Sequence, residues 1–145
     1  MQELWGITPH HSDYDVGQLD DVIIGINDPR LRAKVSEIIE IDDMVWIHPS
    51  AVIGIECHWN SGTHINYGVT MTRTTIGHHT TISPGVTICG DVTIGDRVLI
   101  GAGSTICDRV TIGNDVTIGA GAVVLPETVI PDGETWFGVP AKTKS

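Results

Sequence analysis

The sequence predicts an all-β solenoid, a parallel β-helix built from six-residue repeats, and two observations favour this fold class. Aromatic residues make up only 5% of the 145 residues while glycine occurs 17 times, so turns and small aliphatic side chains organise the core. In the second half of the chain an aliphatic anchor returns every six positions. These anchors are Ile76, Ile82, Ile88, Ile94, Ile100, Ile106, Ile112, Ile118, Val124 and Ile130.

A period of six fits neither an α-helix nor plain strand alternation. Glycine or another small residue usually follows the anchor, and the fourth residue after it is small or branched. Branched residues favour extended backbone and glycine accepts turn angles, so each repeat is expected to form a short strand and a turn. Stacked coils then pair their backbones and enclose a narrow apolar interior. The fourth-place residues are Thr80, Val86, Val92, Val98, Ser104, Val110, Val116, Ala122 and Thr128.

The repeat has one irregular step. The register extends upstream to Met71, but Ile76 follows Met71 after five residues instead of six. Trp59 and Met71 also stand at anchor places that are aliphatic later in the chain. Two interpretations remain open: an irregular first part of a solenoid, or a functional site where the repeat is broken. The upstream anchors are Ile47, Ile53, Trp59, Ile65 and Met71.

The chain is expected to divide into an N-terminal strand–helix segment at 1–46, the β-helix at 47–135 and a C-terminal cap or tail at 136–145. A strand and a helix cannot form an independent domain. The N-terminal segment is therefore expected to pack over the first coil or against another subunit, where it would shield the open end of the stack.

Residues 22–26 predict a short buried strand, and the Asp28-Pro29 pair predicts the capped start of a helix that continues to about Ile41. The helix is expected to bury an apolar face. That face comprises Leu31, Val35, Ile38 and Ile39.

Charge and composition exclude several classes of partner. The formal net charge is −10 and no cluster of Lys and Arg exists, so neither nucleic acid nor an anionic membrane surface is expected as a partner. The longest apolar stretch, 22–26, is far too short to span a bilayer, and the N-terminus lacks the features of a signal peptide. Three cysteines are too few for a disulfide scaffold. We therefore expect a cytoplasmic protein.

Specific segments of the chain are similar to the hexapeptide-repeat acyltransferases, whose solenoid is a left-handed, triangular β-helix. Within that superfamily the chain resembles the bacterial sugar and sialic acid O- or N-acetyltransferases. The N-terminal strand and helix resemble the end of the mononucleotide-type domain that these enzymes carry. The matching segments are His48-Pro49-Ser50-Ala51, Asn66, Ile82-Ser83-Pro84-Gly85-Val86, Cys89-Gly90, 101–104, 119–122 and 138–142.

The resemblance implies an enzyme that moves an acetyl group from acetyl-CoA to a hydroxyl or amine of a sugar-like acceptor. It implies a homotrimer with the donor in a groove between subunits. No metal is expected, because His78 and His79 are adjacent rather than spaced like the zinc ligands of a γ-type carbonic anhydrase. By position, the implied donor contacts are Thr81, Gly90, Ala102 and Ala120, and the implied acceptor contacts are Asn66 and Arg73.

The catalytic base is the point of departure from the family. In the resembling enzymes a histidine takes the proton of the acceptor, but the corresponding stretch, 72–74, contains none. His78 and His79 follow closely and are the predicted bases, because imidazole titrates near neutral pH. His58 and His64 are the second choice. Alternatively, the protein is a catalytically inactive homologue that binds CoA or another ligand, or acts as a scaffold.

Cys89 and Cys107 lie eighteen residues apart, each directly after an anchor. They are expected to stack on successive coils about 4.8 Å apart. A nucleophilic thiolate needs a positive neighbour that lowers its pKa, so packing explains these cysteines better than catalysis does.

Overall fold

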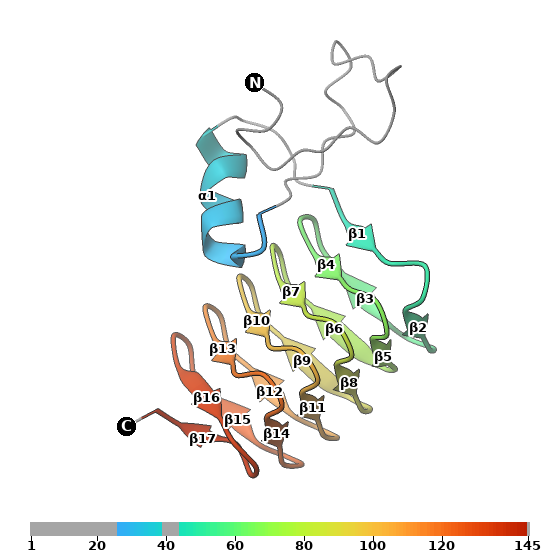
Figure 1. Ribbon diagram of the computed structural model, residues 1–145, viewed down its shortest axis with the longest axis vertical. Helices are drawn as coiled ribbons and strands as arrows, with labels where there is room; N and C mark the ends of the chain where they lie inside the picture. The colour runs from blue at the N-terminus through green and yellow to red at the C-terminus, as the bar shows by residue number, and fades with distance from the viewer. Residues whose placement is uncertain (1–25, 39–43, 145) are drawn as a thin grey trace.

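The computed structural model describes residues 26–38 and 44–144, which form a parallel β-solenoid with one helix along its side (Figure 1). The chain visits three sheets in turn, and each coil adds a strand to each of them. We call the sheets A, B and C in the order in which the chain reaches them. The predicted parallel β-helix is confirmed.

The strands are short. Sheet A holds β1 (Trp46–Ile47), β4 (His64–Ile65), β7 (Thr81–Ile82), β10 (Leu99–Ile100), β13 (Thr117–Ile118), β16 (Thr135–Phe137) and β17 (Lys142–Thr143), the last antiparallel to β16. Sheet B holds β2 (Val52–Ile53), β5 (Thr70–Met71), β8 (Thr87–Ile88), β11 (Thr105–Ile106) and β14 (Val123–Val124). Sheet C holds β3 (His58–Trp59), β6 (Thr74–Ile76), β9 (Val92–Ile94), β12 (Thr111–Ile112) and β15 (Val129–Ile130).

The predicted anchors form the core. From Ile76 to Ile130 every anchor is at most 2% exposed, and anchors of successive coils stack on one another, as Ile82 does on Ile100. The fourth-place residues from Thr80 to Ala122 are at most 1% exposed and fill the corners of the triangle. Two inward positions per repeat therefore account for the interior, as the sequence predicted.

The irregular step is confirmed as well. Ile65 pairs with Ile82, seventeen residues later, whereas Ile82 pairs with Ile100, eighteen residues later. The turn between β5 and β6 has only residues 72–73, while the turn one coil later spans 89–91. The missing residue therefore shortens one corner and leaves the core register intact.

The helix α1 (Pro29–Ile38) begins as predicted. The Asp28 carboxylate Oδ1 accepts hydrogen bonds from the backbone N–H groups of Arg30 at 2.9 Å and Leu31 at 3.2 Å. Such a cap satisfies two of the amides that a helix start leaves without partners. Residues 22–25 of the predicted strand at 22–26 and the predicted continuation of the helix at 39–41 lie outside the described residues, and Ile26, which is described, is not part of a strand.

The predicted apolar face of α1 is confirmed only at Val35. Leu31 and Ile38 are 50% and 73% exposed, and Val35 is buried together with the polar residues Arg32 and Ser36. Ile39 lies outside the described residues. The reason is that α1 lies on turns whose carbonyl groups point outward, and such a surface requires hydrogen-bond donors rather than aliphatic side chains.

Arg32 supplies these donors. Its side chain is 0% exposed, and Nη2 donates to the carbonyl oxygens of Gly62 and His79, both at 3.0 Å. Nη1 donates to Thr81 Oγ1 at 3.0 Å and to the carbonyl oxygen of Ile26 at 2.8 Å. Gly62 and His79 belong to turns of successive coils, so α1 runs along the side of the stack. The expectation that this segment shields the open end is therefore wrong for α1 (Figure 1).

Within the part of the chain that the structure describes, no helix combines the length and the apolar character needed to cross a membrane.

Replacement of Arg32 by methionine should release α1 without unfolding the solenoid. Each buried carbonyl left without a donor costs about 1–3 kcal/mol, so the amides of α1 should exchange with solvent faster by a corresponding factor. Hydrogen exchange read by mass spectrometry distinguishes α1 from the strands. Lys34→Met, on the exposed side of the same helix, is the control. Unchanged exchange of α1 in Arg32→Met would contradict this role.

Candidate active site

The predicted site residues lie at three different corners of the triangle. The A–B corner (48–51, 66–69, 83–86, 101–104 and 119–122) carries Asn66, Ala102 and Ala120. The B–C corner (54–57, 72–73, 89–91, 107–110 and 125–128) carries Arg73 and Gly90. The C–A corner (60–63, 77–80, 95–98, 113–116 and 131–134) carries His78 and His79, with Thr81 just beyond it in β7. A single chain therefore does not bring them together.

The A–B corner presents a strip almost without side chains, which we call the glycine strip: Gly85, Ala102, Gly103, Ala120 and Gly121, all exposed. Its glycines have a left-handed backbone, with φ of 71°, 69° and 70°. A Cβ atom at Gly103 or Gly121 would meet nothing within 4 Å. The other two corners place residues such as Asp91 and Arg97 in the same conformation. Packing within the chain thus does not require glycine here, and the strip leaves room for another molecule to approach the backbone.

The B–C corner is occupied by Arg73. Its Nε donates to Asp91 Oδ1 at 3.0 Å, and its guanidinium lies on Gly90, where an added Cβ atom would be only 2.1 Å from Nη2. Gly90 therefore lacks a side chain because Arg73 fills that space. The Arg73 side chain is still 42% exposed, so it can meet a ligand.

Cys89 and Cys107 are at this corner as predicted. Ile88 pairs with Ile106, and the Cys89 N–H donates to the Ile106 carbonyl oxygen at 2.8 Å, so the two cysteines stack on successive coils. Burial raises the pKa of the Cys89 thiol, and the nearby Asp108 and Cys107 raise it further. A thiol with a raised pKa stays protonated near neutral pH, which argues against a nucleophilic role.

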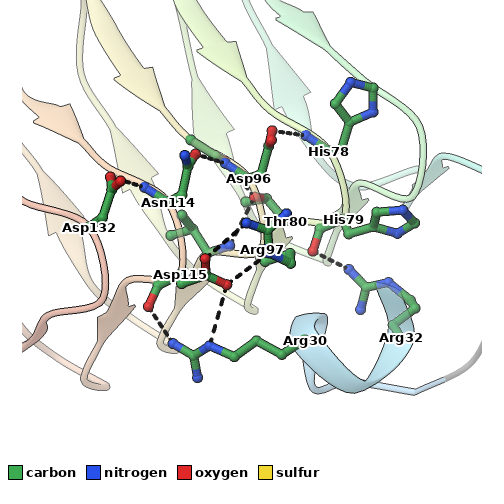
Figure 2. Close-up of polar contacts among 12 residues, drawn as sticks. Arg30, Arg32, His78, His79, Thr80, Asp96, Arg97, Asn114, Asp115 and Asp132 are labelled. Carbon is green, nitrogen blue, oxygen red and sulfur yellow. Dashed lines mark hydrogen bonds and ion pairs between the residues drawn. The ribbon is translucent and has the colours of Figure 1, made fainter. Parts of the chain in front are cut away.

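At the C–A corner a ladder of side chains fixes the backbone before His78 (Figure 2). Asp132 Oδ1 accepts from the Asn114 N–H, Asn114 Oδ1 from the Asp96 N–H, and Asp96 Oδ1 from the His78 N–H, each at 2.8 Å. His78 Nδ1 lies 3.0 Å from Ser61 Oγ. The imidazole of His78 is thus oriented on one side by a hydroxyl while the residue remains exposed.

His79 has a different environment from His78. Its backbone is left-handed with φ 54°, and its ring lies against Gly62, where a Cβ atom would be 2.2 Å from Nδ1. Its carbonyl oxygen accepts from Arg32, and Figure 2 shows its ring beside α1 while the His78 ring points away from the helix. Of the two predicted bases, His78 has the more accessible imidazole.

Three other predicted residues differ in how far they are exposed: Thr81 and His64 are buried, and His58 is exposed. The Thr81 side chain is 0% exposed, and its hydroxyl donates to the Asn27 carbonyl oxygen at 3.3 Å. An acyl donor such as acetyl-CoA could therefore contact Thr81 only if α1 moved. His64 is 7% exposed and meets the Trp46 ring edge-on, with ring centroids 6.2 Å apart. His58 is exposed on β3.

Sequence reasoning did not single out Ser61 or Asp96 as partners of His78. Asp96 stands eighteen residues after His78, one full coil, and that spacing is the signal that could have identified it. Ser61 could not be found from a fixed spacing, because the short turn at 72–73 shifts it to seventeen residues.

A groove lies beside the contact between α1 and the C–A corner, and it is lined by Arg30, Leu31, Ala33, Lys34, Glu37 and Arg97. Arg97 donates to both carboxylate oxygens of Asp115, at 2.8 and 2.9 Å, and Arg30 contacts the same residue. The hydrogen bond from Arg97 lowers the pKa of Asp115, and the charges of Arg97 and Arg30 lower it further. No group of three or more His, Cys, Asp or Glu side chains in 26–38 and 44–144 is arranged to hold a metal ion.

Comparison with known proteins adds family and structural matches. The bacterial transferase hexapeptide family (six repeats) matches residues 73–108 and 93–126. No curated protein sequence matches the chain.

Three solved structures illustrate the structural similarity. PerB from Caulobacter crescentus in complex with CoA and GDP-perosamine is 30% identical, with a TM-score of 0.69, over 85% of this chain and 69% of that chain. A histidine-to-asparagine mutant of perosamine N-acetyltransferase from the same organism, with CoA and GDP-perosamine, is 28% identical, with a TM-score of 0.74, over 89% of this chain and 71% of that chain. The acetyltransferase domain of PglB from Neisseria gonorrhoeae, in complex with acetyl coenzyme A, is 25% identical, with a TM-score of 0.65, over 86% and 70% of the respective chains.

The Asp115 pair should make stability depend on pH. Because the folded-state pKa of Asp115 is lowered, its contribution is present above the unfolded pKa of about 3.9 and is lost as the pH falls through the folded value. Asp115→Asn should be less stable than the wild type at pH 7 by at most about 1 kcal/mol, since the pair is partly exposed. Urea unfolding should show the same difference at pH 7 and pH 5 and a smaller difference at pH 3, and added salt should reduce it. A difference that stays constant at pH 3 would refute the assignment.

Proposed function

Because the chain belongs to the hexapeptide-repeat acyltransferases, we propose that it transfers an acetyl group from acetyl-CoA to a hydroxyl or amine of a sugar-like small molecule. The observation that carries the proposal is the glycine strip, whose open backbone suits an extended acyl donor. The similar solved structures support it, since they are acetyltransferases that contain CoA or acetyl-CoA. A cytoplasmic location, where acetyl-CoA is available, is part of the same proposal.

We place the pantetheine arm of the donor along Ala102 and Ala120. Small exposed residues let the pantetheine arm, which contains amide groups, lie flat on the protein backbone and form hydrogen bonds with it. Gly90 and Thr81 contribute less in this arrangement, because Arg73 covers the first and α1 covers the second. The acceptor lies toward Asn66 and Arg73, and the exposed guanidinium of Arg73 suits a phosphate or carboxylate on it.

The assembly that we propose is a homotrimer. Residues from three corners can meet only if corners of different chains face one another, so the site is incomplete in one chain. Exposed apolar residues on and beside sheet B supply part of the proposed subunit contact, together with Val129 on sheet C and Phe137 on sheet A. Those on and beside sheet B are Val52, Ile55, Tyr67, Leu125 and Val139, from 50% to 73% exposed.

The proposed chemistry needs one base and one set of oxyanion donors. The acceptor oxygen or nitrogen attacks the thioester carbonyl carbon while His78 takes its proton. Backbone N–H groups stabilise the oxyanion, and the carbon–sulfur bond then breaks to release CoA as the thiol. His79, held beside α1, is the less accessible alternative.

One observation favours a second function. Arg73 stands in the stretch that corresponds to the catalytic histidine of the resembling enzymes, and a guanidinium cannot act as a base near neutral pH. If no imidazole reaches the acceptor, the chain binds CoA or a related ligand without catalysis, or serves as a scaffold.

Bulky residues on the glycine strip should abolish donor binding. CoA should raise the melting temperature of the wild type by mass action, whereas Ala102→Trp and Ala120→Trp should lose that shift. Light scattering should give about three times 15.6 kDa for the wild type and for both variants. Thr93→Trp, exposed on sheet C, is the control and should keep the shift. An unchanged shift in both strip variants would place the donor elsewhere.

The base is tested by His78→Asn and His79→Asn. His78→Asn should keep the CoA-induced shift but lower acetyl transfer by the ~10²–10⁴-fold typical of a lost general base. His58→Asn, exposed on sheet C, should retain full activity. If neither His78→Asn nor His79→Asn changes the rate, the assignment is wrong and His58 and His64 become the candidates. CoA binding without transfer to any acceptor in a broad panel would favour the binding protein.

A further inference from the structure

Two cysteines that acetyl transfer does not use stack at the B–C corner. Cys89 and Cys107 each follow the paired residues Ile88 and Ile106, and their N–H groups donate to the carbonyl oxygens of Ile106 and Val124 at 2.8 and 3.0 Å. Both side chains therefore leave the backbone at equivalent points of successive coils. Both thiols are free and half-buried.

The spacing distinguishes two kinds of dithiol chemistry. Parallel side chains on neighbouring coils keep their Cβ atoms about as far apart as the strands, about 4.8 Å. A disulfide needs Cβ atoms about 3.5–4.5 Å apart and sulfurs about 2.05 Å apart, so the coils would have to be pinched together. Two collinear metal–sulfur bonds of about 2.3 Å span about 4.6 Å, which is close to the spacing of the strands.

The surroundings restrict the kind of ion. Asp108 Oδ1 already accepts the Gly90 N–H at 2.9 Å, and a tetrahedral zinc site would need four ligands. Hard ions such as Mg²⁺ and Ca²⁺ require several oxygen ligands. Soft thiolate ligands select ions such as Cu(I).

We propose that Cys89 and Cys107 form a two-coordinate site for one soft metal ion, such as Cu(I). On binding, two sulfur–hydrogen bonds break and two metal–sulfur bonds form. Two protons leave to the buffer, and no electron is transferred. This site is independent of the proposed acetyl transfer and does not require the donor groove.

The test uses Cu(I) supplied anaerobically to the full chain, in competition with a chromophoric Cu(I) chelator. The wild type should remove one equivalent from the chelator, and the number of thiols that react with a thiol reagent should fall from three to one. Cys89→Ser and Cys107→Ser should each fail to remove Cu(I) from the chelator. Cys57→Ser is the matched control and should retain it, because Cys57 lies on an earlier coil, with Sγ contacting the Ile55 carbonyl oxygen at 3.6 Å.

Two results would overturn the proposal. One is that Cys107→Ser competes for Cu(I) as well as the wild type does. The other is that the loaded wild type still exposes all three thiols. Circular dichroism establishes that each serine variant is folded, and Cys89→Ala and Cys107→Ala replace any variant that is not.

Discussion

Backbone pairing between successive coils is the constraint on which this structure depends. The N–H of Thr81 donates to the carbonyl oxygen of Val98, and the same bond recurs in the next coil from Leu99 to Val116. Since this pairing fixes the register, a residue at a given place in the repeat stacks on its equivalent in the next coil. Columns of chemically related residues are therefore the units from which both stability and function are built.

The columns at the left-handed turn positions give the three corners different characters. At the A–B corner this position is always glycine in the second to fifth coils, at Gly68, Gly85, Gly103 and Gly121. At the B–C corner the column alternates in charge from coil to coil and forms ion pairs such as Arg109–Glu127, with Nε and Oε1 3.1 Å apart. Opposite charges on adjacent coils add a little to stability and disfavour other registers. Its members are Glu56, Arg73, Asp91, Arg109 and Glu127.

The sequence predicted what depends on local periodicity. The anchors, the fourth-place residues, the shortened turn at 72–73 and the cap at Asp28 all follow from neighbours in the chain or from a fixed spacing. The buried face of α1 does not, because Arg32 is placed by carbonyl groups of turns that lie 30 and 47 residues away. A pattern of hydrophobic and polar residues treats every arginine as a surface residue. The guanidinium group, however, carries five hydrogen-bond donors in one plane, which makes arginine suitable for packing against exposed carbonyl groups.

The distribution of the candidate site over three corners also could not be read from spacing alone. His78 lies five residues after Arg73, yet the chain crosses β6 between them, and so they occupy different corners. In the proposed mechanism, the change at 72–73 therefore moves the base to another corner of the triangle. In a trimer, different corners face different neighbouring subunits. An imidazole at the C–A corner therefore approaches an acceptor from a different direction than a histidine at 72–74 would. Arg73, held by Asp91 and seated on Gly90, is then free to bind the acceptor rather than to deprotonate it.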